Sequence, residues 1–215
     1  MSIQSRFLIG LFFVVGLVVA LVFIFNSIGD DASGAADPDA QVVREDSHRL
    51  SQATDEKAVL VEFLDYECEA CLAASPFVSD LATEYEENLT VVARYFPLPG
   101  HPNSETAAAA VEAAAQQGKF EEMHSLMYEK QTDWSHTSET RAGTFREYAQ
   151  SLGLDMPAYD AIVADPATME RVNKDKTDGV ALNVQGTPTF FLEGRKIQPS
   201  SEEEFRQLIE TAISQ

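Results

Sequence analysis

Residues 58–71 read AVLVEFLDYECEAC, an apolar run followed by a pair of cysteines. The run from Ala58 to Leu64 is rich in branched residues, as expected of a buried central strand. Apolar residues recur at helical spacing after Cys71, so a helix is expected to begin near the cysteines. The stretch therefore predicts a strand that leads directly into a helix, with a Cys-x-x-Cys pair at the start of that helix.

A thiol at the start of a helix is more reactive than an ordinary cysteine. The free N–H groups and the helix dipole stabilise the thiolate, which is the nucleophilic form. The spacing lets the second thiol reach back and resolve a mixed disulfide on the first. We therefore expect Cys68 to be an exposed nucleophile and Cys71 to be the resolving thiol, one turn further in.

Two other interpretations of the cysteine pair have less support. A zinc site needs two further ligands, and two thiolates suffice for Cu(I), but no methionine cluster accompanies them. Two inert core cysteines are the remaining alternative. The four histidines are not paired at a ligand spacing; they are His48, His101, His124 and His136. We predict no metal and no cofactor.

The charge balance of the chain argues against nucleic acid as a partner. The 215 residues include 15 Lys and Arg against 35 Asp and Glu, with a formal net charge of -20. Binding to phosphates needs clustered cations, so we predict no nucleic-acid partner. A hydrophobic content of 45% is sufficient for a core, and the length fits one domain with an appendage.

The N-terminus is predicted to lie outside the globular fold. After a stub at residues 1–6, residues 7–25 (FLIGLFFVVGLVVALVFIF) are 19 residues without a charge. Such a helix is about 28 Å long, close to the ~30 Å of a bilayer core. Arg6 precedes it and acidic residues follow, which predicts a cytoplasmic N-terminus and an external domain. A cleaved signal peptide is the alternative, because small residues occupy 32–36.

The remainder divides into a linker and one domain. Residues 26–48 are rich in Asp, Ala, Ser and Gly, which predicts a flexible acidic linker. The domain is expected over residues 49–215. A second strand is predicted at 90–96, a mainly helical stretch at about 101–182, and a hairpin with a final helix after it. This order predicts an α/β fold in which helices cover a sheet.

From about Arg49 to its C-terminus the chain resembles the DsbA-like thiol–disulfide oxidoreductases of the thioredoxin superfamily, of the membrane-anchored bacterial type. The strand followed by Cys-x-x-Cys and Pro76 in the next helix match that family. The helical insertion at about 101–182 matches as well, and Gly186-Thr187-Pro188 resembles the cis-proline loop. The resemblance implies a thioredoxin-like fold, with a central mixed sheet flanked by helices.

The resemblance also implies roles for residues outside the cysteine pair. Glu62, six residues before Cys68, stands where the family places a buried carboxylate, and it would exchange a proton with Cys71. A cis Thr187-Pro188 bond would place the Thr187 backbone beside Cys68, where an extended substrate can pair with it. Simpler alternatives are a Glu62 that faces solvent from an edge strand and an ordinary trans Pro188.

Between its cysteines the chain departs from the best-known members of the family, which carry Pro-His there. This chain has Glu69-Ala70 instead, flanked by Asp65 and Glu67. Nearby anions disfavour a thiolate. We therefore expect a raised pKa for Cys68 and a disulfide that is less oxidising than those of the His-bearing relatives.

Together these features predict an extracytoplasmic thiol–disulfide oxidoreductase held in the cell membrane by its N-terminal helix. It would act as an oxidant on thiols of exported proteins that are unfolded or partly folded, and a membrane redox partner would reset it. A reductase with the same site is one alternative. A redox-inert thioredoxin-like binding or metallochaperone module is another. His101 is a candidate to border the active face, whereas His124 is expected on a helix surface.

Overall fold

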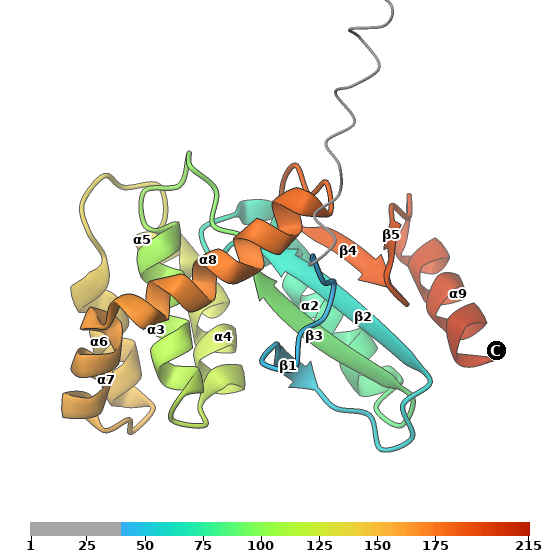
Figure 1. Cartoon of the computed structure of the whole chain (residues 1–215), viewed down its shortest axis with the longest axis horizontal. Coiled ribbons are helices and arrows are strands. Elements are labelled where there is room, and N and C mark those ends of the chain that lie inside the picture. Colours follow the sequence, from blue (N-terminus) through green and yellow to red (C-terminus); the bar gives the residue numbers. More distant parts are fainter. Residues whose placement is uncertain (1–39) are drawn as a thin grey trace, which may run out of the picture. The chain divides into compact units, whose positions relative to one another are not determined.

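The computed structural model describes residues 40–215, which contain a mixed sheet of five strands (Figure 1). The strands are β1 (His48–Ser51), β2 (Ala58–Leu64), β3 (Leu89–Tyr95), β4 (Thr189–Leu192) and β5 (Arg195–Ile197). Their order is β1-β3-β2-β4-β5, in which β2 and β3 are parallel and the other neighbours are antiparallel. The apolar run at 58–64 is thus the central strand, as predicted.

Helices cover both faces of this sheet (Figure 1). Helix α2 (Glu69–Glu84) and helix α9 (Glu202–Ile213) pack against one face, in an apolar cluster that includes Leu60. Helix α8 (Pro166–Ala181) approaches the other face, where Gly179 lies against Phe63 and Phe96. Pro76 lies inside α2, as the sequence predicts. The fold is therefore the thioredoxin-like α/β arrangement that the sequence indicates.

All residues between β3 and β4 that form regular structure are helical. The helices are α3 (Ser104–Ala115), α4 (Phe120–Glu129), α5 (Gln131–Trp134), α6 (Ala142–Ser151), α7 (Met156–Ala164) and α8. Their core continues that of the sheet, because Tyr66 and Tyr95 belong to the same apolar cluster as Trp134 and Phe145. The insertion is thereby fixed against the end of β2, where the cysteines lie.

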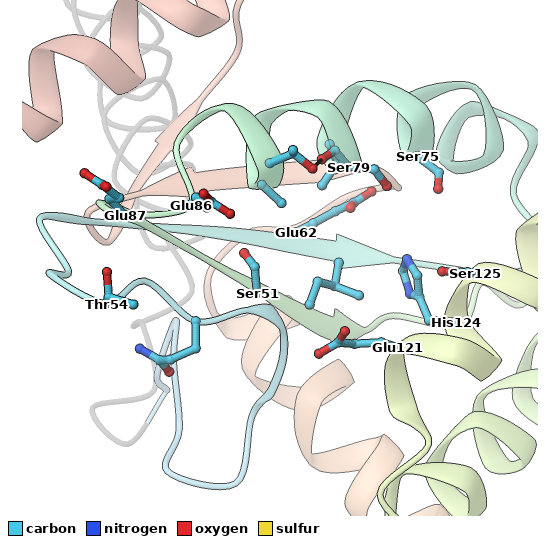
Figure 2. A pocket seen from close by; sticks show the side chains of 15 residues that line it. Ser51, Thr54, Glu62, Ser75, Ser79, Glu86, Glu87, Glu121, His124 and Ser125 are labelled. Atoms are coloured by element: carbon cyan, nitrogen blue, oxygen red, sulfur yellow. Dashed lines mark hydrogen bonds between the residues drawn. The ribbon is translucent and has the colours of Figure 1, made fainter.

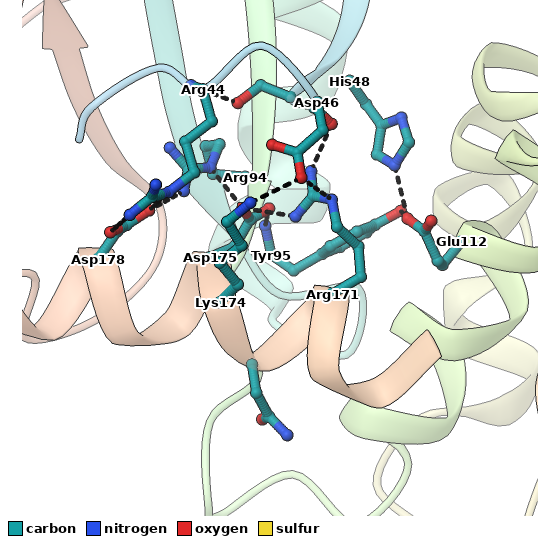
Figure 3. Close-up of polar contacts among 12 residues, drawn as sticks. Arg44, Asp46, His48, Arg94, Tyr95, Glu112, Arg171, Lys174, Asp175 and Asp178 are labelled. Carbon is teal, nitrogen blue, oxygen red and sulfur yellow. Dashed lines mark hydrogen bonds and ion pairs between the residues drawn. The ribbon is translucent and has the colours of Figure 1, made fainter. Parts of the chain in front are cut away.

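The segment just before β1 corrects the predicted linker. The Arg44 guanidinium pairs with Asp178 of α8 at 2.5 Å (Figure 3). Arg94 of β3 donates to the carbonyls of Gln41 and Val42 at 3.0 and 2.7 Å. The prediction of a flexible linker up to residue 48 is therefore wrong over its last residues. Local composition could not show this, because the partners lie far along the chain.

The predicted membrane segment lies outside the described residues. That holds for the stub at 1–6, the transmembrane helix at 7–25 and the linker up to residue 39. Within residues 40–215, no helix is both long enough and apolar enough to cross a bilayer. The choice between a retained anchor and a cleaved signal stays a prediction.

Candidate active site

The two cysteines lie at the start of α2, directly after the central strand. Cys68 is the N-cap residue, and its carbonyl accepts a hydrogen bond from Leu72 N at 3.1 Å. Cys71 lies one turn further in and is fully buried, whereas Cys68 is 6% exposed. The first thiol therefore stands at the helix start, as expected, but it is less exposed than predicted.

The loop before β4 accounts for this burial of Cys68. The Thr187-Pro188 peptide bond is cis, and the Cys68 thiol donates a hydrogen bond to the Thr187 carbonyl, with 3.4 Å between Sγ and O. The Thr187 hydroxyl is also buried, and it has no hydrogen-bond partner among residues 40–215. Two segments 119 residues apart in the chain thus meet at one sulfur atom.

The two thiols differ sharply in acidity. The pKa of Cys68 is lowered to about 5, chiefly because the Cys71 thiol donates a hydrogen bond to its sulfur. The Thr187 hydroxyl and the N–H groups of Cys71 and Ala70 make smaller contributions that favour the thiolate. Burial, together with this hydrogen bond, raises the pKa of Cys71 far above its ordinary value. At neutral pH the reduced protein therefore carries one thiolate, on Cys68. The prediction of a raised Cys68 pKa is wrong.

The prediction of a raised pKa failed because the carboxylates of Asp65 and Glu67 accept hydrogen bonds from backbone N–H groups. The Asp65 carboxylate accepts hydrogen bonds from the N–H groups of Glu67 and Leu98, both at 2.8 Å. The Glu67 carboxylate accepts from the N–H groups of Asn103 at 2.6 Å and His136 at 2.8 Å. Both acidic side chains are buried. They fasten loops of the insertion to the active site, and the N–H groups compensate their charge.

Two histidines from the insertion contact acidic side chains around the cysteines. His101 Nδ1 lies 2.7 Å from Asp65 Oδ2, and His136 Nε2 lies 2.9 Å from Glu69 Oε1. The two rings are perpendicular, with 6.0 Å between their centroids. His101 thus lies where the sequence indicated, whereas His136 was not anticipated. In the part of the chain that the structure describes, no group of three His, Cys, Asp or Glu residues is arranged to hold a metal ion.

Glu62 is buried in the central strand, with 2% of its surface exposed. The edge-strand alternative is wrong, because β2 pairs with β3 on one side and with β4 on the other. Burial, together with the nearby Cys68 charge, raises the pKa of Glu62 to about 8. Within the described range no hydrogen bond or ion pair reaches its carboxyl group. A carboxyl group without partners is therefore held in an apolar strand.

The Glu62 side chain borders a polar pocket of about 630 Å³, which Figure 2 shows between α2, β1 and α4. Hydroxyl groups of Ser75 and Ser79 line it from α2, and His124 lines it from α4. His124 was expected on a helix surface, but it is buried, with Nδ1 at 3.1 Å from the Tyr66 hydroxyl. Burial lowers the pKa of His124 to about 3, so its ring is neutral at physiological pH.

Gln131 is a further residue of the site that sequence reasoning missed. It lies in α5 and is buried, and its side-chain amide donates to the carbonyls of Tyr66 at 2.8 Å and Cys68 at 3.0 Å. It thereby holds the backbone at the start of α2. A single glutamine in a short helix has no sequence signal that could have revealed this contact.

Known proteins match most of the described domain. A family model described as thioredoxin matches residues 53–211. A Na(+)/H(+) antiporter NhaA of Herminiimonas arsenicoxydans is 38% identical over 146 residues, which are 68% of this chain and 22% of that protein. An NhaA 1 antiporter of Salinispora arenicola is 40% identical over 139 residues, 64% of this chain and 20% of that protein. The chain thus spans about a fifth of the length of these curated relatives.

Solved structures share the fold. A thioredoxin-like oxidoreductase from Silicibacter pomeroyi has a TM-score of 0.69 at 24% identity, over 84% of this chain and 99% of that one. BdbD from Bacillus subtilis has a TM-score of 0.68 at 21% identity, over 79% and 94%. The thiol-disulfide exchange protein alpha-DsbA2 from Wolbachia pipientis has 0.62 at 19%, over 75% and 84%.

Proposed function

The chain belongs to the thioredoxin family, and from this premise we propose that it is a thiol–disulfide oxidoreductase with Cys68-Glu69-Ala70-Cys71 as its redox centre. The observation that carries the proposal is the contact between the Cys68 sulfur and the Thr187 carbonyl, at 3.4 Å, above the buried Cys71. This contact joins a reactive sulfur, a resolving thiol and a loop backbone that an extended substrate can pair with.

The proposed reaction oxidises two substrate thiols. A substrate thiolate attacks the Cys68 sulfur of the Cys68–Cys71 disulfide, and Cys71 leaves and takes up a proton. A second substrate thiolate then attacks the substrate sulfur of the mixed disulfide and releases Cys68 as a thiolate. The substrate loses two electrons and the cysteine pair gains them. A Cys68 pKa of about 5 makes it a good leaving group, which favours this direction over the reductase alternative.

Glu62 supplies the proton that Cys71 takes up. A charge on Glu62 raises the pKa of Cys71, which supports an interaction between the two groups. A pKa of about 8 keeps the Glu62 carboxyl mostly protonated at neutral pH, so it is available as a general acid. The polar pocket beside Glu62 offers water a route by which the lost proton is replaced.

The Thr187 hydroxyl gives the released sulfur a further partner. In the thiol form, Cys68 donates to the Thr187 carbonyl. When Cys68 ionises it becomes an acceptor only, and the unpartnered hydroxyl of Thr187 can turn to donate to it. Charge-assisted hydrogen bonds are the stronger kind, so this change favours the thiolate.

Substrates are extended segments of exported proteins that are unfolded or partly folded. A second pocket of about 500 Å³ adjoins the cysteine loop, and Phe77, Pro188 and Phe190 are among its lining residues. It can take apolar side chains of a segment that pairs with the backbone at Thr187. A membrane redox partner reoxidises the cysteine pair, and residues 7–25 hold the domain at the outer face of the cell membrane.

Single substitutions of the cysteines test this function. Cys68→Ser should abolish oxidation of a reduced test protein, whereas Cys71→Ser should accumulate mixed disulfides, because no thiol resolves them. Each variant is the control for the other, since both remove one thiol of the same pair. Limiting iodoacetamide should modify Cys68 first in the reduced protein. Modification of Cys71 first, or exchange activity that survives in Cys68→Ser, would refute the proposal.

Cell fractionation tests the location. The full chain should stay with the membrane after a high-salt wash, because an apolar helix does not depend on charge for its attachment. A soluble protein whose N-terminal sequence begins near Ala35 would show instead that residues 7–25 are a cleaved signal.

A further inference from the structure

The dipeptide between the cysteines supplies no cation to the Cys68 thiolate. Glu69 is acidic and Ala70 is apolar, yet the thiolate is the favoured form of Cys68. A cation brought to this place from elsewhere in the fold would stabilise the same form. His101, in the loop between β3 and α3, is held to Asp65, whose backbone carbonyl accepts the N–H group of Cys68.

The position of His101 is fixed by Asp65. The imidazole Nδ1 lies 2.7 Å from Asp65 Oδ2, and the same oxygen accepts Leu98 N at 2.8 Å. The backbone carbonyl of Asp65 accepts Cys68 N at 3.1 Å. One residue therefore joins the imidazole, its loop and the backbone of the nucleophile. The His101 side chain is 17% exposed, which leaves little freedom to turn away.

The groups that face His101 are mainly acidic. Asp65 faces it from the loop after β2, with Glu67 and the Cys68 thiolate beyond, and the His136 ring stands perpendicular to it at 6.0 Å. Burial disfavours the charged imidazole, but the hydrogen bond that it donates to Asp65 and the charges of Asp65, Cys68 and Glu67 outweigh this effect. The net result is a raised pKa for His101.

We propose that His101 is a redox-tuning residue, whose imidazolium is held by Asp65 and stabilises the Cys68 thiolate in the reduced protein. This role rests on the proposed function, because it concerns the same sulfur. The charge of His101 adds to the hydrogen bond from the Cys71 thiol, which is the chief cause of the lowered pKa of Cys68.

The role has a thermodynamic consequence. Reduction of the disulfide takes up two electrons and one proton, and it yields a Cys68 thiolate and a Cys71 thiol. The thiolate exists only in the reduced protein, so its attraction for the imidazolium exists only there. By linkage, His101 binds its proton more tightly after reduction. In the pH range where His101 is charged only in the reduced protein, reduction takes up a second proton.

Proton NMR of the full chain tests this linkage without a substitution. The imidazole Hε1 signal of His101, assigned by its loss in His101→Gln, is followed through pH 5–9 in the oxidised and reduced proteins. We expect its titration midpoint to lie at higher pH in the reduced protein. The buried His124 is the internal control, because it should stay neutral across this range. Equal midpoints for His101 in the two redox states would overturn the proposal.

Matched histidine variants give a second test. We expect His101→Gln to move the thiolate titration at 240 nm to higher pH and to lower the equilibrium constant for reduction by glutathione by about twofold to fivefold. His101→Lys, which restores a cation, should recover much of that loss. His136→Gln is the control, because its pair with Glu69 is 47% and 69% exposed and should contribute little.

The outcomes separate this role from the proposed function. If wild-type Cys68 shows no thiolate below neutral pH, the proposed nucleophile fails, and the tuning role fails with it. If the thiolate is present but folded His101→Gln titrates like wild type, only the tuning role of His101 is refuted.

Discussion

A carboxyl group and a guanidinium group are buried in neighbouring strands at the centre of the sheet, and among residues 40–215 only the guanidinium group has partners. Glu62 of β2 pairs in register with Ala93, and Phe63 pairs with Arg94 of β3. Since successive residues of a strand point to opposite faces, Glu62 and Arg94 lie on opposite faces of the sheet. Both are at most 2% exposed.

Arg94 has a partner for each of its nitrogen atoms, and Figure 3 shows the two carboxylates among them. Its Nε donates to Asp175 at 2.7 Å and one terminal nitrogen donates to Asp178 at 2.5 Å. The other donates to the carbonyls of Gln41 and Val42. The network joins β3 to α8 and to the segment before β1. Removal of any partner would leave a buried charge or a buried carbonyl unsatisfied.

Glu62 has none of this compensation in the described part of the chain, and it borders a polar pocket instead. Its pKa of about 8 is the consequence of burial without partners. A buried charge that is fully paired holds the structure together. A buried carboxyl group that is left unpaired has a raised pKa, close to neutral pH. Such a pKa suits a group that transfers protons.

The largest expected effect is on turnover in Glu62→Leu. Loss of the acid should slow oxidation of a reduced test protein by about 10²–10⁴-fold, while iodoacetamide still modifies Cys68 at nearly the wild-type rate. The free energy of unfolding should rise by about 1–3 kcal/mol, because an unpartnered polar group leaves an apolar strand. Glu62→Gln keeps the shape without the acid, and it should be as slow. Wild-type turnover in both variants would show that Glu62 transfers no proton.

The next effect is on stability in Arg94→Met. This substitution takes from Asp175 and Asp178 one of the two guanidinium groups that each contacts, and it leaves the carbonyls of Gln41 and Val42 without their donor. It should lower the free energy of unfolding by about 3–5 kcal/mol, measured by urea denaturation. Turnover per folded molecule should not change.

Arg206→Met is the matched control for Arg94→Met. Arg206 pairs with Glu84 at 3.1 Å near the surface, and such pairs contribute about 0–1 kcal/mol. A loss below about 1 kcal/mol in Arg94→Met would mean that its network stabilises the fold no more than a surface pair.

These two residues also show what could be predicted from the sequence. Glu62 stands out because a carboxylate interrupts an apolar run just before two cysteines, so local pattern was enough. Arg94 lies in TVVARYF. A strand with a solvent-exposed arginine would have the same sequence pattern, so the pattern does not reveal that Arg94 is buried. Its partners come from α8, about eighty residues later, and from the segment at 40–47, so no local pattern shows them.

The acidic residues around the cysteines make the same point about electrostatics. Asp65 and Glu67 were expected to raise the pKa of Cys68, because sequence proximity alone places anions beside it. Their charge is compensated by backbone N–H groups of Leu98, Asn103 and His136. Which donors face a carboxylate is a property of the folded loops, and composition does not record it.

Helix α8 packs closely against the face of the sheet that carries Arg94 and Phe63. A Cβ atom on Gly179 would lie 2.6 Å from Phe96 and 3.1 Å from Phe63, so one of these elements must shift. Gly179→Ala should therefore cost about 1–3 kcal/mol of unfolding free energy in urea. Gly143→Ala, in α6 with no atom within 4 Å, is the control and should gain about 0.5–1 kcal/mol. Equal gains in both variants would show that close approach of α8 does not determine the packing.

The smallest expected effect is a difference between Glu62 and Arg94 in how their contributions to stability depend on pH. The pKa of Glu62 rises on folding from its ordinary 4.5 to about 8. Between these values the folded protein holds a proton that the unfolded chain has released, so this group lowers stability as pH rises. The slope is at most about 1.4 kcal/mol per pH unit. From pH 6 to pH 7, the stability advantage of reduced Glu62→Leu over reduced wild type should therefore grow by about 1.4 kcal/mol.

The contribution of Arg94 to the free energy of unfolding should not change with pH in this range. Burial opposes ionisation of Asp178, but hydrogen bonds from Arg44 and Arg94 prevail and keep its pKa below its ordinary 3.8. Its stabilising contribution is therefore complete above about pH 4 and is lost only on acidification through the lower folded pKa. The unfolding free energy that Arg94→Met loses should be the same at pH 6 and pH 7 in urea titrations under reducing conditions. If the difference in unfolding free energy between Glu62→Leu and wild type were also independent of pH, Glu62 would already be ionised in the folded protein. The lack of partners around Glu62 would then not have raised its pKa.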